Sequence, residues 1–313
     1  MLDIIKIILP IFITILIGYL IAYFQMLNKD QFKIIGLFII KVSIPCLLIV
    51  SISSQDFHAL IQAPYLISYG SASFIVFLTT LILYFKVFAM PLNASSVMAM
   101  SSSMSNTGFI GSGLLYLLIG ERAAIYFGMT FLIENFVVFL MFLICLEFSK
   151  SRAPIQDILK NSIINVLKNP IVIALLLGSS MSLCSLQLPE LLLNVIKPIG
   201  QTSMPLGLLV IGGSLYGITL MAQKSLGRDI AITLGLKLII LPALVYGIFH
   251  LFPSATAEMI FAGTLLASVS MVGMSAVYAQ QYDMKKVPFI LLMSTLCSII
   301  SLTTVIHFLH GSV

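Results

Sequence analysis

The sequence predicts an all-α integral membrane protein with ten transmembrane helices in two inverted repeats of five. Three observations lead to this fold. Apolar stretches of about 20 residues, the length that a helix needs to cross a bilayer, recur along all 313 residues. Only 9% of the residues are charged, against about 25% in soluble domains. The basic residues fall in alternate loops, and one short motif occurs in both halves of the chain.

The ten predicted spans are 4–24, 34–52, 63–84, 94–119, 123–148, 163–184, 191–215, 230–252, 257–279 and 287–309. Helices are expected because backbone groups in lipid must be satisfied within their own segment. Barrel strands would be about ten residues long and would alternate in polarity. The first span is expected to be retained, since it lacks the small-residue cleavage site of a signal peptide.

The loops predict the orientation of the chain. Loops after odd-numbered spans carry eleven basic residues, whereas loops after even-numbered spans carry only Arg122 and Lys197. The eleven are Lys29, Lys33, Lys86, Lys150, Arg152, Lys160, Lys168, Lys224, Arg228, Lys285 and Lys286. Basic loops stay in the cytoplasm, so we expect both termini outside a plasma (inner) membrane.

The second and seventh spans carry the repeated motif. Ser43 and Pro45 match Ser203 and Pro205 at an offset of 160 residues. We therefore divide the chain into a first repeat (1–148), a cytoplasmic connector (149–162) and a second repeat (163–313). Because each repeat has an odd number of spans, the second is inverted relative to the first. Inverted repeats are typical of secondary transporters that bind substrate near the membrane midplane, and both prolines are expected to kink their helices.

The fourth and ninth spans are predicted to be broken. Asn106, Thr107 and Gly108 lie near the centre of the fourth span, and Asn and Gly favour turns over continuous helix. Freed backbone groups and a half-helix dipole would then bind substrate or ion. The ninth span carries weaker signals at Ser268, Ser270, Gly273 and Ser275. The alternative is that these small residues only allow close helix packing.

Three ionisable residues lie inside predicted spans, where charge is expensive and often functional. We expect Lys41 to receive an anionic substrate, to replace a sodium ion or to pair with Glu134; a buried structural pair is the alternative. Glu134, Asn135 and Gln201, which matches Lys41 in the repeat, are candidates for coupling or charge pairing. Lys237 is interpreted as structural, since it lies close enough to one end of its span to extend to the cytoplasmic interface.

Several function classes are disfavoured. The basic residues form no patch for nucleic acid, and there is no Walker A motif for ATP. An intramembrane enzyme would need clustered carboxylates, a Ser/His pair or metal ligands. We expect no enzyme activity, no metal and no cofactor beyond a coupling ion, H⁺ or Na⁺. A cation antiporter or symporter of similar fold is the alternative, although such proteins usually carry several core acids and this chain has only Glu134.

Four stretches of the chain carry a family resemblance: VSIPCLLIVSIS, SNTGFIGSGLLYLLIG, KNPIVIALLLG and ASVSMVGMSAVYAQQYDMKKVPFILLMSTLCSIISLTTV. They resemble the auxin efflux carrier family, which includes bacterial malonate-type and plant auxin carriers. Together they extend the resemblance over the whole chain. Two positions depart from the family pattern: Ser270 and Met274 stand where a Pro and an Asn are common. Lys41 is also unexpected at its place.

The resemblance implies a scaffold domain and a transport domain that move like an elevator. It also implies that the fourth and ninth helices cross at the midplane, where the substrate binds. The substrate would be a small organic anion such as malonate, another carboxylate or an auxin-like molecule. The surrounding partner is membrane lipid, and a homodimer is a further expectation.

Overall fold

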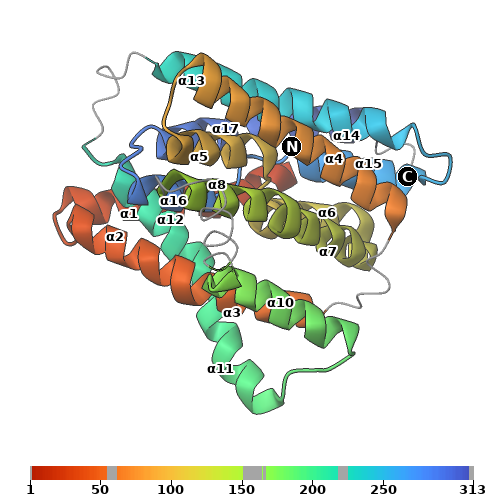
Figure 1. The fold of residues 1–313 in the computed structure, drawn as a ribbon, viewed down its shortest axis with the longest axis horizontal. Coiled ribbons are helices and arrows are strands. Elements are labelled where there is room, and N and C mark those ends of the chain that lie inside the picture. The colour runs from red at the N-terminus through yellow and green to blue at the C-terminus, as the bar shows by residue number, and fades with distance from the viewer. Residues whose placement is uncertain (1, 55–61, 151–163, 165–166, 218–224, 310–313) are drawn as a thin grey trace.

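The computed structural model describes residues 2–54, 62–150, 164, 167–217 and 225–309 (Figure 1). Over these residues the protein is helical, apart from turns and one isolated antiparallel bridge. Helices occupy all ten predicted ranges. Most of the predicted connector, 149–162, lies outside the described residues, as do Arg152, Lys160 and Lys224.

The first half of the chain contains α1 (Leu2–Tyr23), α2 (Lys29–Phe38), α3 (Ile44–Ser53), α4 (Ala63–Ile82), α5 (Leu92–Ser103), α6 (Ser112–Ile119), α7 (Ala123–Ile133) and α8 (Leu140–Lys150). The second half contains α10 (Pro170–Leu183), α11 (Glu190–Gln201), α12 (Ser203–Leu215), α13 (Leu226–Gly235), α14 (Leu241–Phe249), α15 (Ala257–Ala267), α16 (Met274–Gln281) and α17 (Val287–Leu309). Short 3₁₀ or π-helical turns join several of them: η1 (Ile39–Ser43), η2 (Leu83–Val87), η3 (Thr107–Gly111), η4 (Gly120–Arg122), η5 (Glu134–Phe139) and η7 (Leu236–Ile240).

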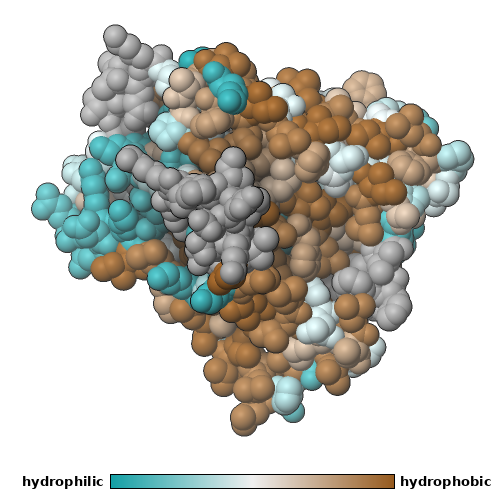
Figure 2. Space-filling view, viewed as in Figure 1, coloured by the Kyte–Doolittle hydropathy of each residue, from teal (hydrophilic) through white to brown (hydrophobic). Residues whose placement is uncertain are grey.

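Many of the described helices have the length and apolar composition of membrane-spanning segments. Six helical stretches are long and apolar enough to cross one, and three further apolar helices are shorter. Large apolar side chains are exposed on the outer helices, among them Leu16, Leu177 and Ile300. Figure 2 shows this apolar surface over most of the visible face, with hydrophilic residues gathered at the end where α1 leads into α2. Contact between such an apolar surface and water is unfavourable, whereas its contact with lipid chains is not. The protein is therefore a multi-pass membrane protein.

Two π-helical turns precede prolines inside helices. The turn η1 comes just before Pro45, and η7 comes just before Pro242. A proline removes one backbone donor and its ring crowds the preceding turn, so the helix widens locally instead of ending. Each turn carries a lysine, Lys41 in η1 and Lys237 in η7. The two lysines thus share a local structure but, as shown below, have different surroundings.

One group of helices packs around α3 and α12. Helix α1 lies along α12, while α10 and α11 pack against α3; Figure 1 shows α3, α10 and α11 together at the lower edge. Glycines permit these contacts: a Cβ at Gly212 would lie 1.9 Å from the Ile15 carbonyl oxygen, and a Cβ at Gly200 would lie 2.7 Å from the Leu47 nitrogen. Spans two and seven therefore touch through their backbones.

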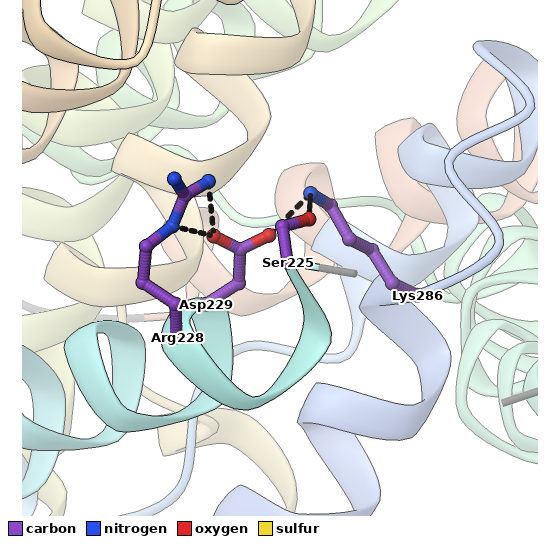
Figure 3. A network of polar contacts seen from close by, with 4 residues as sticks. All are labelled: Ser225, Arg228, Asp229 and Lys286. Atoms are coloured by element: carbon purple, nitrogen blue, oxygen red, sulfur yellow. Dashed lines mark hydrogen bonds and ion pairs between the residues drawn. The ribbon is translucent and has the colours of Figure 1, made fainter. Parts of the chain in front are cut away.

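A second group contains α4, α5, α7, α8, α13, α14, α15 and α17. A polar cluster ties the start of α13 to the start of α17 (Figure 3). The buried Asp229 carboxylate accepts from Arg228 Nη2 at 3.2 Å and also pairs with Lys286, which reaches Ser225 Oγ at 3.4 Å. The Arg228 guanidinium in turn lies 3.8 Å from the centre of the Phe88 ring. This cluster fixes the start of α17 against the second group.

Candidate transport site

The fourth and ninth spans are both interrupted. Helix α5 ends at Ser103, and helical structure resumes at Thr107 with η3, followed by α6. Helix α15 ends at Ala267, and α16 begins at Met274. The Asn and Gly residues of the fourth span, and the Ser and Gly residues of the ninth, therefore lie at or beside non-helical backbone.

The two interruptions are bonded to each other. Ser105 and Met271 form the isolated antiparallel bridge. The Asn106 amide donates to the Ser270 carbonyl at 2.8 Å, and the Val272 amide donates to the Met104 carbonyl at 3.1 Å. Backbone groups freed by the breaks thus satisfy one another, as they must where water is scarce.

A buried carboxylate holds the first break in place. Glu134, at the start of η5, accepts the Ser105 amide at 2.7 Å and the Tyr69 hydroxyl at 2.9 Å on Oε1. Its Oε2 accepts the Thr107 hydroxyl at 2.9 Å. Three donors surround a side chain that is 1% exposed, so the carboxylate is fixed by the protein itself.

Lys237 lies on the other side of the same break. Its ammonium donates to Ser105 Oγ at 2.6 Å and to the Ala267 carbonyl at 2.7 Å, and the side chain is fully buried. The prediction that Lys237 extends to the membrane interface is therefore wrong. The last carbonyl of α15 carries the negative end of a helix dipole, and this carbonyl and Ser105 hold the ammonium inside the protein.

The contacts define a one-directional chain of hydrogen bonds. Tyr69 has a single hydroxyl proton, and it goes to Glu134. In the 3.1 Å contact between Tyr69 and Ser105, Ser105 is therefore the donor. Ser105 Oγ in turn accepts from Lys237. A continuous chain of donors thus runs from Lys237 through Ser105 and Tyr69 to Glu134.

The second break is supported in a similar way. The Met271 amide donates to Ser294 Oγ on α17 at 3.0 Å. Its bridge partner Ser105 donates to Glu134 in the fifth span. Glu134 and Ser294 lie 160 residues apart, which is also the offset of the repeated Ser–Pro motif. An acid supports one break and a hydroxyl supports the other.

A cavity of about 210 Å³ lies against both breaks. It lies between the two helix groups, because α1, α3 and α12 line one side and the breaks, α7, α16 and α17 line the other. Five of the predicted site residues line it: Asn106, Gly108, Gly273, Glu134 and Asn135. Three predicted residues at the breaks do not line it: Thr107 bonds Glu134, Ser275 donates to the Val272 carbonyl, and Ser270 supports the first break through its backbone.

Lys41 lies outside this cavity. Its side chain is exposed, and neither an ion pair nor a hydrogen bond joins it to Glu134 in the described structure. The expectations that Lys41 faces the substrate or pairs with Glu134 are not met in this structure, because Lys41 is exposed and is not one of the residues that line the cavity. Gln201 is also exposed, at the end of α11.

The two prolines of the repeated motif have different surroundings. Pro45 is buried after η1, whereas Pro205 is exposed just after α11 gives way to α12 at Thr202. The two spans meet beside these prolines, where Ser43 Oγ lies 2.9 Å from Thr202 Oγ1. The second span widens at η1 without ending, whereas the seventh is interrupted at Thr202. Ser203 and Gly207 of the seventh span lie on the cavity wall.

Sequence reasoning missed Tyr69 and Ser105. Tyr69 looks like one more aromatic residue of an apolar span, and Ser105 is one of four serines in the run 101–105 of the fourth span. Only the fold brings Tyr69, Ser105, Glu134 and Lys237 together from four different spans. The available signal was the depth of Glu134 and Lys237, since intramembrane charges tend to be paired.

Comparison with known proteins assigns the chain to a family. Residues 3–306 match the family model described as "Membrane transport protein". The chain is also 22% identical over 316 residues to a protein of Rhizobium meliloti (strain 1021) named "Putative malonate transporter", with 99% of this chain and 97% of that protein covered. The resemblance to auxin efflux carriers is thereby confirmed, and the protein is a transporter rather than an enzyme. The chain belongs to the membrane transport protein family, the family of the auxin efflux carriers.

Proposed function

We propose that this protein is a secondary active transporter that carries a small organic anion across the membrane in which it is embedded. The observation that supports this most directly is the position of two half-helix N-termini at one cavity. Asn106 and Gly108 flank the start of η3 and α6, and Gly273 and Met274 flank the start of α16. A helix N-terminus carries about half a positive charge and binds anions.

The arrangement also supports alternating access by an elevator movement. The cavity lies at the boundary between two helix groups. Sliding one group along the other would therefore move the site from one side of the membrane towards the other. The breaks belong with the second group through Glu134, Lys237 and Ser294. We propose that the α1, α3 and α12 group is the scaffold and that the second group moves.

The ten-span inverted topology is part of the same proposal. The Ser105 amide donates to Glu134, and the Met271 amide donates to Ser294 at the matching position of the other half. These two bonds, and the contact between Ser43 and Thr202, are what two inverted repeats would produce. With odd loops in the cytoplasm, both termini would lie outside the plasma membrane. Lys237 provides a fixed positive charge at the break, where a carrier of this type could otherwise bind a coupling cation. We therefore propose that transport does not require Na⁺.

Uptake into proteoliposomes tests the proposal. Labelled malonate and a panel of other carboxylates would be offered with and without proton and sodium gradients. Saturable carboxylate flux that falls at least tenfold in Asn106→Ala is expected, because Asn106 lines the cavity at the first half-helix. Asn194→Ala, which removes an exposed amide on α11, is the matched control and should transport normally.

Absence of carboxylate flux from folded protein would contradict the proposal. Flux of a cation that depends on Glu134 would support the rival antiporter. The geometry favours the anion, since three protein donors already surround the Glu134 carboxylate. A flux that requires sodium on one side would overturn the proposed role of Lys237.

A further inference from the structure

Three buried polar side chains follow one face of α13 and η7. Asp229, Thr233 and Lys237 occur at intervals of four residues, a spacing that places side chains on the same face of a helix. All three are fully buried. Buried polar groups in a membrane helix are costly and usually serve a function, and the candidate transport site uses only Lys237.

This polar face begins at an aqueous surface. The Asp229 carboxylate lies between Arg228 and Lys286, as Figure 3 shows, and both basic side chains are partly exposed. Arg228 and Lys286 belong to loops that are expected in the cytoplasm. Because Lys286 contacts both water and the buried carboxylate, it can pass protons from one to the other.

Two hydroxyls continue the polar face from Asp229 towards Lys237. The Tyr84 hydroxyl, on η2, is fully buried and lies beside the Thr233 hydroxyl and the Asp229 carboxylate. Neither hydroxyl makes a hydrogen bond of good geometry among the described residues. An ammonium has three N–H donors, and Lys237 uses two of them, on Ser105 and the Ala267 carbonyl. One buried water, which bonds to groups that otherwise lack a partner, is enough to join the third to Thr233.

The far end of the polar face reaches the cavity. From Lys237 the hydrogen bonds run through Ser105 and Tyr69 to Glu134, and each donor is directed at the next acceptor. Glu134 lines the cavity. The polar groups therefore connect the surface at Asp229 with the cavity through the interior of the second helix group.

Glu134 has a reason to take up a proton. It is the ionisable side chain among the described residues that line the cavity. An anion bound near Asn106 and Gly273 would approach its carboxylate, and two negative charges close together disfavour each other. The titratable or charged groups that face Glu134 are Tyr69 and Lys237, so the proton comes from the side of Lys237.

We propose that protons reach Glu134 through the interior of the second helix group rather than through the cavity. The path starts at Asp229, continues through the hydroxyls of Thr233 and Tyr84 to Lys237, and follows the existing hydrogen-bond chain to the carboxylate. Binding of the anion loads Glu134 with one proton, and release of the anion returns it. The coupling to the anion rests on the proposed transport function.

The transfer is a series of proton exchanges that leaves the relay residues unchanged. Lys237 gives a proton to Ser105 Oγ, Ser105 gives its own to the Tyr69 oxygen, and Tyr69 gives its own to Glu134 Oε1. The carboxylate becomes a carboxylic acid and the ammonium becomes an amine. A proton from the Asp229 end then restores the ammonium, so Lys237 carries its positive charge before and after each transfer.

Proton uptake on anion binding tests the coupling. Purified protein in a weakly buffered detergent solution would be mixed with malonate, or with the carboxylate that the uptake assay identifies, in a stopped-flow instrument containing a pH-sensitive dye. We expect about one proton per bound anion, the capacity of one carboxylate, and no uptake in Glu134→Gln. Anion binding without proton uptake would overturn the inference, as would full uptake in Glu134→Gln.

Thr233→Val and Tyr84→Phe test the path. Each removes a hydroxyl that makes no good hydrogen bond, so the fold and the amount of proton uptake should be retained. The rate of uptake should fall at least about tenfold, because a positioned proton relay contributes about 10²–10⁴-fold to a rate. Thr80→Val is the matched control, since it removes a buried hydroxyl that donates to the Val76 carbonyl, and it should keep the wild-type rate.

A wild-type rate in either path variant would overturn the part assigned to that hydroxyl. Wild-type rates in both would mean that protons enter through the cavity, so the path would be wrong.

Failure of this inference can be told apart from failure of the proposed function. Carboxylate flux without proton uptake, or with an uptake rate that both path variants leave unchanged, overturns the inference and leaves transport of an organic anion standing. Absence of binding and flux for every carboxylate overturns both. Proton movement without any carboxylate would favour the rival antiporter and overturn the coupling to anion binding.

Discussion

Glu134 and Lys237 contact the same residue, Ser105, through different atoms. The Ser105 amide donates to the carboxylate, and the Ser105 hydroxyl accepts from the ammonium. The first break is thus held between opposite charges from the fifth and eighth spans. Both residues lie on π-helical turns, η5 and η7, which occur frequently at functional sites.

Lys237→Met should destabilise the protein strongly. It leaves the buried Glu134 carboxylate without a neighbouring cation and removes the donor to the Ala267 carbonyl. Removing one of two opposite buried charges that compensate each other costs up to about 3–5 kcal/mol, which thermal unfolding in detergent would detect. Lys41→Met is the matched control, since Lys41 occupies the equivalent turn before Pro45 but is exposed. Equal stability losses in the two variants would contradict the role given to Lys237.

Glu134→Gln combined with Lys237→Met should lose less stability than the two single changes added together. Each single change leaves an unpaired buried charge, whereas the double variant leaves none. A double-mutant cycle on the unfolding free energies measures this coupling. A coupling below about 0.5 kcal/mol would mean that the two charges act independently.

Tyr69→Phe should cost more than Tyr65→Phe. Tyr69 donates to the carboxylate of Glu134, whereas Tyr65 shares a 2.7 Å contact with the neutral hydroxyl of Thr130. A hydrogen bond to a charged group is worth about 1.5–3 kcal/mol, and one between neutral groups about 1 kcal/mol. Both tyrosines are fully buried, and phenylalanine keeps the ring in each, so the two variants differ in the hydrogen bonds that are lost. The reverse order of unfolding free energies would contradict the donor chain.

Gly212→Ala should separate α1 from α12 and reduce the yield of folded protein. The new methyl would lie 1.9 Å from the Ile15 carbonyl oxygen, which belongs to the backbone and cannot turn away. Overpacking of this kind costs about 1–3 kcal/mol or more. Gly247→Ala is the control, because nothing lies within 4 Å of a Cβ at that position. Size-exclusion profiles of the two variants give the comparison, and a normal profile for Gly212→Ala would show that the helices can move apart freely.

Asp229→Asn should destabilise the protein more than Arg228→Ala. Asp229 is fully buried and Lys286 is 13% exposed, so the substitution leaves a nearly buried ammonium without its partner. The Arg228 side chain is 44% exposed, and ion pairs of exposed groups contribute less than about 1 kcal/mol. Thermal unfolding of both variants tests the order, and a larger loss in Arg228→Ala would place the main contribution on its packing against Phe88.

The positions of the helices were predictable from the sequence, and their contacts were not. Apolar runs of membrane-spanning length determine helices, because a backbone in lipid has no other way to satisfy its polar groups. The breaks near Asn106 and Ser270 were also predictable, since Asn, Gly and Ser locally favour non-helical backbone. These preferences act within a single segment, so the sequence of that segment is enough to recognise them.

The role of each buried charge was decided by the tertiary structure alone. Lys41 and Lys237 have similar local sequences, each a few residues before a proline, yet one is exposed and the other is fully buried. Depth along a helix can be read from the sequence, but the direction in which a side chain points depends on which helices pack beside it. For Lys237 those neighbours are Ser105 and the end of α15, and they come from spans far away in the chain.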